Sequence, residues 1–235
     1  MSSDVLVSAE DLVVRRGDFT LNVPRWQVRA GEVVGLVGPN GAGKTTLLET
    51  LPGLRPLDGG SLSVFGRDPW DDPVGVRLSL GYMTDDLPLF AMRIDRLLRT
   101  LSGYYQDWDA DLVELLLDRF ELSPSRKVWE LSKGEGTRLR LITAMAFRPR
   151  LLVLDEPAAG LDLAGRRRLL ESVLDVVRDA QRSVVFSSHA LHDVERIADR
   201  LLVLNRGKVV RDGATDALVG DGRTLEEALE AWGAV

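Results

Sequence analysis

The chain has 235 residues, no cysteine, two histidines and a formal net charge of −6. Its length allows one large domain or two small ones. The lack of cysteine excludes a disulfide scaffold and a cysteine-ligated zinc or iron–sulfur site, and two histidines argue against a histidine-based metal site. The acidic balance argues against a broad nucleic-acid-binding face, which requires positive charge. No nucleic-acid partner is therefore expected.

The sequence also lacks the patterns of a secreted or membrane-spanning protein. The first residues include the acidic Asp4 and no basic start followed by an apolar run, unlike a secretory signal. The apolar runs are short, and none approaches the ~18 residues that a membrane-spanning helix requires. We therefore expect a cytosolic protein in which any role at a membrane depends on a partner chain.

The first predicted elements are strands. Residues 4–36 have a strand-rich pattern that leads into an apolar strand over 33–37. A glycine-rich loop over 38–46 follows, then a helix over 45–54 and strands again within 59–82. Residues 92–149 carry apolar side chains at helical spacing, which predicts a largely helical insert.

Strands and helices alternate after this insert. We predict a strand over 151–154, a helix over about 164–180, a strand over 183–187, a helix over 190–198, a strand over 201–204 and a short helix near 225–232. Strands that alternate with helices form a parallel sheet with crossover helices. The predicted fold class is therefore α/β, with a parallel sheet flanked by helices.

The most specific motif lies between the strand over 33–37 and the next helix, where the sequence matches G-x-x-x-x-G-K-[ST]. Glycines let several backbone N–H groups point into one cavity, and the N-terminus of the following helix adds partial positive charge. Lys44 would contact the β- and γ-phosphates of a nucleotide, and the Thr45 hydroxyl would hold Mg²⁺. The predicted nucleotide-binding residues are Gly38, Pro39, Asn40, Gly41, Ala42, Gly43, Lys44, Thr45 and Thr46.

Two adjacent carboxylates follow the strand over 151–154. Asp155 is placed to hold the magnesium shell, directly or through water, and Glu156 is placed to orient or deprotonate the attacking water. Alone, such a pair indicates only a strand end that meets solvent. The phosphate loop elsewhere in the chain favours the catalytic interpretation.

A third motif is Leu131-Ser132-Lys133-Gly134-Glu135. In isolation it predicts the start of a helix, with Ser132 and Glu135 forming a capping box. The order of phosphate loop, LSKGE, LLVLDEP and Ser188-His189 resembles, over nearly the whole chain, the nucleotide-binding subunit of ATP-binding cassette (ABC) transporters. The family motif is LSGGQ, so Lys133 and Glu135 depart from it.

This resemblance implies ATP and Mg²⁺ as ligands and two subunits packed head to tail, with each ATP between one phosphate loop and the other subunit's signature motif. Ser132 and Gly134 would contact the γ-phosphate through backbone donors and the helix dipole, and Lys133 would add a cation. Asp162 matches the D-loop, which crosses the dimer interface. His189 matches the switch histidine near the γ-phosphate and attacking water, although a lone histidine at a strand end is often structural.

Two further positions depart from the family pattern. Members usually carry a glutamine that joins the catalytic core to the helical insert, where this chain has Asp85; a carboxylate there could reach Mg²⁺ through water. Members also stack an aromatic ring on adenine just before a glycine, where this chain has Arg16. Either the planar guanidinium of Arg16 or the ring of Phe19 could take that place.

A narrower resemblance joins segments 104–109 and 127–132, with Phe120, to bacterial ABC-2-type exporter cassettes, although helix packing explains residues 104–108 equally well. The block 85–90 would lie near the groove that receives the permease's coupling helix. The family implies a P-loop NTPase core with an N-terminal antiparallel β subdomain. The whole chain, 1–235, would be one domain, with a core of about 1–84 and 150–235 and a helical subdomain of about 85–149.

The leading functional hypothesis is an ATP-hydrolysing subunit that powers transport, in the export direction, through a separate membrane permease. Such a subunit would be peripheral on the cytoplasmic face of the membrane and would pair with itself or with a related cassette. An ABC ATPase without a permease, such as a cluster-assembly type, also fits the length. A P-loop kinase would leave LSKGE and Ser188-His189 unexplained.

Overall fold

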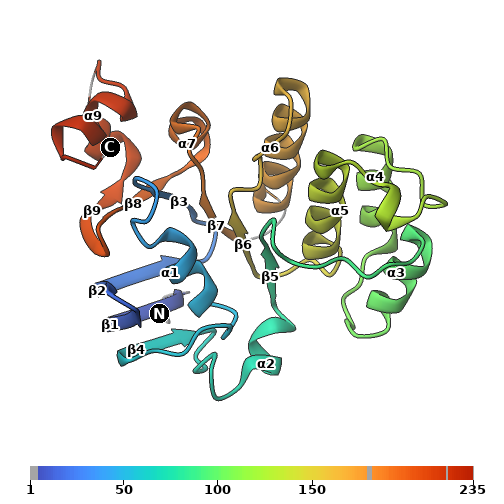
Figure 1. Ribbon diagram of the computed structural model, residues 1–235, viewed down its shortest axis with the longest axis horizontal. Helices are drawn as coiled ribbons and strands as arrows, with labels where there is room; N and C mark the ends of the chain where they lie inside the picture. The colour runs from blue at the N-terminus through green and yellow to red at the C-terminus, as the bar shows by residue number, and fades with distance from the viewer. Residues whose placement is uncertain (1–4, 179–181, 221, 235) are drawn as a thin grey trace.

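The computed structural model describes residues 5–178, 182–220 and 222–234, which build one mixed sheet surrounded by helices (Figure 1). The strand order is β4-β1-β2-β9-β8-β3-β7-β6-β5. The strands are β1 (Val5–Arg16), β2 (Phe19–Arg29), β3 (Val33–Val37), β4 (Gly59–Val64), β5 (Leu80–Met83), β6 (Leu151–Asp155), β7 (Ser183–Ser187), β8 (Arg200–Asn205) and β9 (Lys208–Ala214).

Helices cover this sheet and extend beyond one end of it. They are α1 (Lys44–Thr50), α2 (Pro73–Arg77), α3 (Ile94–Ser102), α4 (Ala110–Arg119), α5 (Lys133–Met145), α6 (Leu163–Arg178), α7 (Leu191–Ile197), α8 (Thr215–Val219) and α9 (Leu225–Ala231), with a 3₁₀ turn, η1, at Val128–Glu130. Within the described ranges, no helix combines the length and the hydrophobicity needed to cross a membrane.

The parallel part of the sheet consists of β8, β3, β7, β6 and β5. Every residue of β3, β6 and β7 is buried, because side chains alternate between two covered faces. On one face Leu36 packs in a core with Leu47 of α1. On the other, Val37 shares a core with Leu169 of α6. The predicted α/β fold is confirmed.

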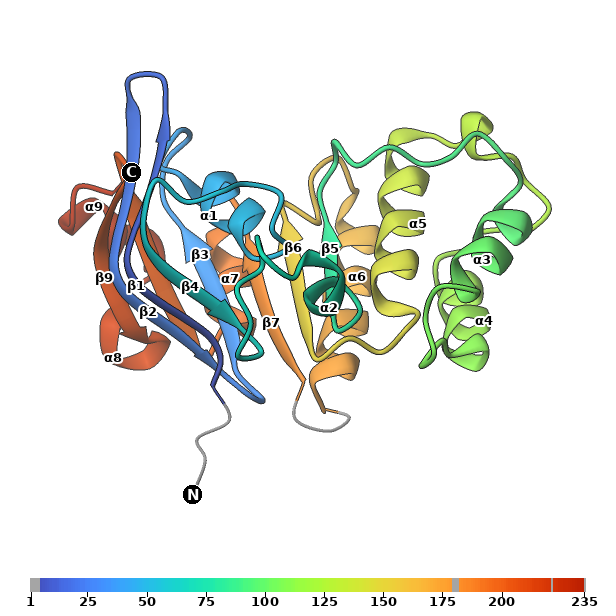
Figure 2. The same cartoon turned by 90° about the horizontal axis from the view of Figure 1, so that it is seen from below.

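The antiparallel part lies at the opposite end of the sheet from α3, α4 and α5 (Figure 2). β1 pairs with β2 from Val5–Arg29 to Arg16–Phe19, and β4 pairs with the other edge of β1. The two parts form one continuous sheet because β9 stands between β2 and β8. Strand β9 was not predicted, because its charged and polar residues interrupt the apolar pattern; it forms by pairing with β8.

The predicted helical segment over 92–149 is confirmed as α3, α4, η1 and α5. The helix predicted over 45–54 is shorter, because α1 ends at Thr50 and the N–H of Gly53 then donates to the Thr50 carbonyl in a turn. The short helices α2 and α8 were not predicted. The last residues of the helix predicted over 164–180 lie outside the described part of the chain.

The turn between β8 and β9 ties the two halves of the sheet to the phosphate loop. The N–H of Gly207 donates to the carbonyl of Ala42 at 3.0 Å, and the Gly207 carbonyl accepts from Asn22 of β2 at 2.6 Å. Gly207 has a φ of +76°, and a Cβ there would lie 2.0 Å from the Thr20 carbonyl oxygen. Only glycine allows this close approach.

We predict that Gly207→Ala costs more stability than Gly66→Ala, measured by urea unfolding. Both glycines have similar positive φ angles, but a Cβ at Gly66 meets no atom of the described residues within 4 Å. Gly66→Ala should lower the free energy of unfolding by about 1 to 2 kcal/mol from backbone strain alone. Gly207→Ala should lower it by roughly 3 kcal/mol or more, because the strand β2 must also move. Equal losses would contradict the proposed role of the turn.

Candidate functional site

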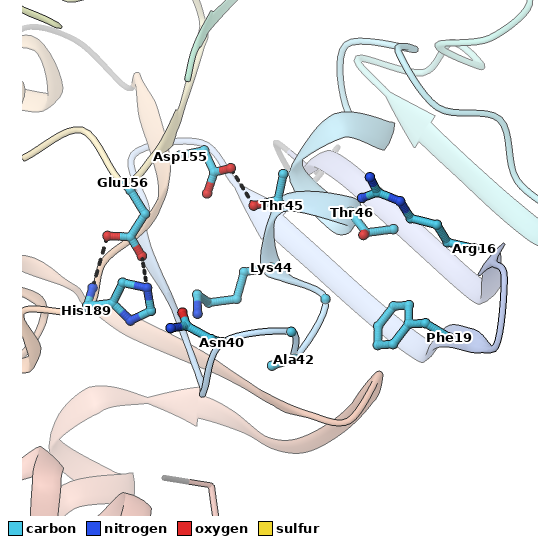
Figure 3. Close-up of a pocket in the computed structure, with 12 residues that line it drawn as sticks. Arg16, Phe19, Asn40, Ala42, Lys44, Thr45, Thr46, Asp155, Glu156 and His189 are labelled. Carbon is cyan, nitrogen blue, oxygen red and sulfur yellow. Dashed lines mark hydrogen bonds and ion pairs between the residues drawn. The ribbon is translucent and has the colours of Figure 1, made fainter. Parts of the chain in front are cut away.

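A cavity of about 440 Å³ opens at the carboxyl ends of β3, β6 and β7 (Figure 3). Parallel sheets present their functional residues at this edge, because the loops that follow neighbouring strands converge there. The cavity is lined by residues of the predicted site, namely Arg16, Phe19, Asn40, Gly41, Ala42, Gly43, Lys44, Thr45, Thr46, Asp155, Glu156 and His189. The structure therefore brings together the phosphate loop, both carboxylates and the histidine.

The phosphate loop turns sharply out of β3 and into α1. Gly38 has a φ of +146°, and a Cβ there would lie 2.0 Å from the Leu204 carbonyl oxygen, so this position requires glycine. Gly41 and Gly43 also have positive φ angles. No side chain in the described part of the protein caps the N-terminus of α1. Its first N–H groups therefore remain available to an anion.

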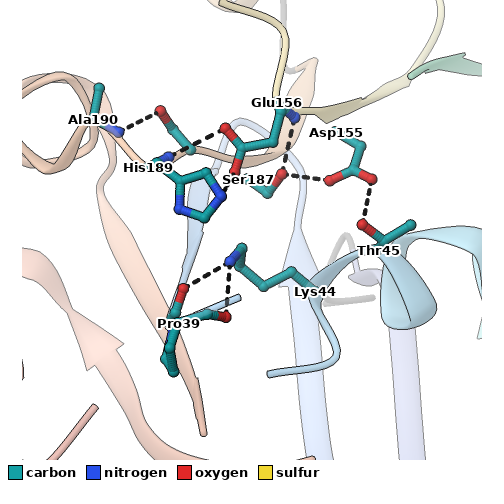
Figure 4. Close-up of polar contacts among 10 residues, drawn as sticks. Pro39, Lys44, Thr45, Asp155, Glu156, Ser187, His189 and Ala190 are labelled. Carbon is teal, nitrogen blue, oxygen red and sulfur yellow. Dashed lines mark hydrogen bonds and ion pairs between the residues drawn. The ribbon is translucent and has the colours of Figure 1, made fainter. Parts of the chain in front are cut away.

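Lys44 is buried beneath this loop (Figure 4). Its Nζ donates to the carbonyls of Gly38 at 2.7 Å and Pro39 at 3.2 Å, which leaves a third N–H for a ligand. Burial lowers the pKa of Lys44 from its usual value, while the nearby carboxylates of Glu156 and Asp155 act in the opposite direction. A phosphate in the cavity would favour the charged ammonium.

The Asp155 carboxylate connects three elements (Figure 4). Its Oδ2 accepts from Thr45 of α1 and its Oδ1 accepts from Ser187 of β7, both at 2.6 Å. The Ser187 hydroxyl in turn accepts from the backbone N–H of Glu156 at 2.9 Å. Ser187 was not predicted as a site residue. A hydroxyl residue at the end of the strand over 183–187 could have indicated it, because β7 runs beside β6 and Ser187 is in register with Asp155.

Glu156 and His189 face each other across the end of the sheet. Glu156 adopts a φ of +50°, an uncommon conformation for a residue with a side chain and one often found at functional sites. Its Oε2 accepts from the backbone N–H of His189 at 3.2 Å. Its Oε1 lies 3.1 Å from the His189 Nε2, yet this oxygen is buried and has no hydrogen bond among the described residues. Beside this ion-pair contact, the carboxylate oxygen retains lone-pair capacity for a hydrogen bond from a ligand or water.

Arg16 and Phe19 lie together at one side of the cavity, on the hairpin between β1 and β2 (Figure 3). The Phe19 ring packs beneath the phosphate loop, since a Cβ on Gly43 would lie 3.0 Å from its Cζ atom. Both side chains are thus positioned at the expected base end of the site, away from the two carboxylates.

The signature motif lies outside this cavity. Ser132 caps α5, and its side chain and that of Glu135 form the predicted capping box. Asp85 is also outside the cavity; it pairs with Lys133 at 3.0 Å and accepts from Thr137 at 3.2 Å. Asp162 accepts from the N–H of Gly165 in the first turn of α6. None of these residues shares the pocket that holds Lys44 and Glu156.

The family model described as ABC transporter matches residues 21–159. The chain belongs to the ABC transporter family. It is an ABC-type ATPase subunit that binds ATP.

Curated relatives extend the match over most of the chain. A Nod factor export ATP-binding protein I of Burkholderia lata is 36% identical over 215 residues, 87% of this chain and 69% of the relative. The molybdenum import ATP-binding protein ModC of Albidiferax ferrireducens is 33% identical, over 88% of this chain and 58% of the relative. An uncharacterized ABC transporter ATP-binding protein of Nostoc is 34% identical, over 65% of its own length. The chain thus spans about two thirds of the length of these relatives.

A solved ATP-binding subunit of an ABC transporter superimposes with a TM-score of 0.88 and is 27% identical in sequence. The alignment covers 97% of this chain and 99% of that one. The mixed sheet and the helices beyond β5 therefore occur together in a known ABC subunit of nearly the same extent.

We predict that Ser187→Ala lowers kcat for ATP hydrolysis by roughly 10- to 100-fold, because it leaves a buried oxygen of Asp155 and the N–H of Glu156 without a partner. Ser187→Thr keeps the hydroxyl and should retain more activity. The control is Ser188→Ala; among the described residues, the Ser188 hydroxyl accepts from the N–H of Ala190 alone, so its loss should matter little. Steady-state kinetics measure the effect, and equal losses at both serines would contradict it.

Proposed function

We propose that this chain is the ATP-hydrolysing subunit of a transporter whose substrate crosses the membrane through a separate permease. It would act as one cassette domain, with a core of about 1–84 and 150–235 and a helical subdomain of about 85–149, on the cytoplasmic face. The observation that carries the proposal is the convergence of Lys44, the pair Thr45 and Asp155, and the pair Glu156 and His189 on one cavity.

The donor set of this cavity fits a magnesium–nucleotide. Thr45 and Asp155 present oxygen atoms 2.6 Å apart, the ligand type that Mg²⁺ prefers. The described residues contain no cluster of three or more acidic or histidine side chains that could hold a metal alone. Phosphate oxygens and water would therefore complete the shell, as is usual for this ion. When bound, Mg²⁺ neutralises negative charge on the phosphates.

Glu156 is the proposed base. Its buried Oε1 has no hydrogen bond among the described residues and can accept one from a water that attacks the γ-phosphate. His189 would position this carboxylate, since its Nε2 lies 3.1 Å from Oε1. The resemblance to the switch histidine of the family adds a contact with the γ-phosphate. Two N–H groups of the Lys44 ammonium donate to carbonyls. The third would stabilise the charge on the β- and γ-phosphates.

A head-to-tail dimer would complete the site. Ser132 and Lys133 are exposed and lie outside the cavity of their own subunit, so they can meet a nucleotide only if another subunit carries it. Leu163, next to Asp162, is 82% exposed, which suits a segment that becomes covered at an interface. The partner would be a second copy or a related cassette.

An apolar groove supports docking to a permease. This groove, of about 340 Å³, lies between the core and the helices beyond β5. It is lined by Pro52, Leu54, Arg77, Leu80, Tyr82, Leu87, Leu101, Tyr105, Thr143, Ala144 and Phe147. We propose that it receives a helix of the permease, with the half-exposed Leu54 at its rim. Exposed apolar grooves of this kind commonly receive a partner protein.

The proposed direction of transport is export. Its support is the resemblance of segments 104–109 and 127–132 to ABC-2-type exporter cassettes, and one relative is named for export. Another relative of comparable identity is named for import. Transport of a labelled substrate into inside-out vesicles that contain both chains would distinguish the two directions.

The first test is Glu156→Gln, which removes the base and keeps the shape of the side chain. This variant should bind ATP and accumulate as a closed dimer in size-exclusion chromatography, with hydrolysis reduced at least about 100-fold. Lys44→Ala is the control and should lose ATP binding itself. Normal hydrolysis by Glu156→Gln would show that another group is the base, and intact ATP binding by Lys44→Ala would contradict the phosphate-loop assignment.

The second test concerns the permease. A tagged wild-type chain, expressed in its native host, should co-purify from membranes with a protein of several apolar spans. Leu54→Glu should abolish this association, because burying a charge in an apolar groove is unfavourable. Leu115→Glu is the matched control, since Leu115 is similarly exposed, at 52% against 48%, and lies outside the groove. Absence of any membrane partner for the wild type would favour an ABC ATPase that works alone.

A further inference from the structure

Lys133 is the first residue of α5, and its side chain reaches the segment that follows β5. Its Nζ lies 3.0 Å from the Oδ2 of Asp85, and its Cδ and Cε atoms lie 3.7 and 3.8 Å from the position of a Cβ on Gly160. Gly160 belongs to the turn that leads from Glu156 to Asp162. The side chain therefore folds back over its own subunit and links three segments that are distant in the sequence.

Asp85 has a second contact on α5. The Thr137 hydroxyl, which is fully buried, lies 3.2 Å from the Asp85 Oδ1 and 3.1 Å from the Lys133 carbonyl, and can donate to either. Close by, Arg140 of α5 donates to the Leu87 carbonyl at 2.7 Å. These contacts hold the segment after β5 against α5 without the help of the Lys133 ammonium.

Lys133 is the more mobile partner on chemical grounds. Its side chain is 70% exposed, whereas that of Asp85 is 27% exposed. Exposed ion pairs are weak, because water screens the charges and a long side chain loses freedom when it is held. The ammonium can therefore leave Asp85 at little cost when a more highly charged anion comes within its reach.

Glu135, the other charged residue in the signature motif, is bound differently. Its carboxylate pairs with Arg126 and accepts from the backbone N–H of Ser132, so it belongs to the cap of α5. Its side chain is 22% exposed. Of the two charges in the signature, the Lys133 ammonium is the one positioned to change partners.

We infer that Asp85 restrains Lys133 within the subunit and that Lys133 exchanges this carboxylate for the γ-phosphate of a nucleotide bound by a second subunit. Asp85 is then a positioning residue that raises the ATP concentration needed for the dimer to close. This inference rests on the proposed function, because it requires the head-to-tail dimer. It also explains together why Asp85 and Lys133 both depart from the family pattern: the carboxylate of Asp85 neutralises the ammonium of Lys133.

The test measures the ATP concentration at which half of the protein is dimeric, by analytical ultracentrifugation in a Glu156→Gln background. Asp85→Asn removes the charge and keeps an oxygen for Thr137. It should lower this midpoint by up to about fivefold, the range of an exposed ion pair. Lys133→Ala should raise the midpoint. Asp86→Asn, which changes the neighbouring exposed carboxylate, is the control and should leave it unchanged.

The double variant identifies the cause. With Lys133→Ala in place, Asp85→Asn should have no further effect, and Lys133→Arg should restore the dependence on Asp85. Asp85→Asn should also leave the ATP affinity of the monomer unchanged, since Asp85 lies outside the cavity. A shift that persists without Lys133, or a change in monomer affinity, would overturn the inference. If the Glu156→Gln parent forms no dimer at any ATP concentration, the proposed dimer fails first, and this inference fails with it.

Discussion

The site depends on one carboxylate. Asp155 uses both oxygens within the protein, one for Thr45 of α1 and one for Ser187 of β7. Because Asp155 closes β6, these two hydrogen bonds join the helix that follows the phosphate loop to two neighbouring strands of the sheet. Buried hydrogen bonds to a charged group are strong and costly to break, so this arrangement fixes the distance between the phosphate loop and Glu156.

The mixed sheet gives the cavity its two ends. The parallel strands bring the phosphate loop, the carboxylates and His189 together at their carboxyl ends. The antiparallel hairpin of β1 and β2 adds Arg16 and Phe19 at the other end, and the turn at Gly207 holds that hairpin against the phosphate loop. Without this hairpin, the cavity would lose both of these side chains.

The cavity and the signature motif lie on different surfaces of the subunit. Its cavity contains groups that can bind and activate a nucleotide, while its signature motif lies at the exposed start of α5, outside that cavity. The contacts that Asp85 and Leu87 make with Thr137 and Arg140 of α5 connect the signature to a segment whose Leu87 lines the apolar groove. In the proposed dimer, a movement of α5 would therefore displace this segment and change the shape of the groove. Nucleotide binding could act on a membrane partner in this way.

The sequence by itself determined the local chemistry: the phosphate loop, the carboxylates after β6, the capping box at Ser132 and the α/β alternation. Each of these depends on neighbouring residues, whose spacing encodes a turn, a helix start or a strand. Only the tertiary structure decided that Ser187 supports Asp155, that Asp85 pairs with Lys133 outside the cavity, and that β9 joins the sheet into one. These features depend on which distant segments become neighbours and on the register in which they pair. A local sequence pattern specifies neither the neighbours nor the register.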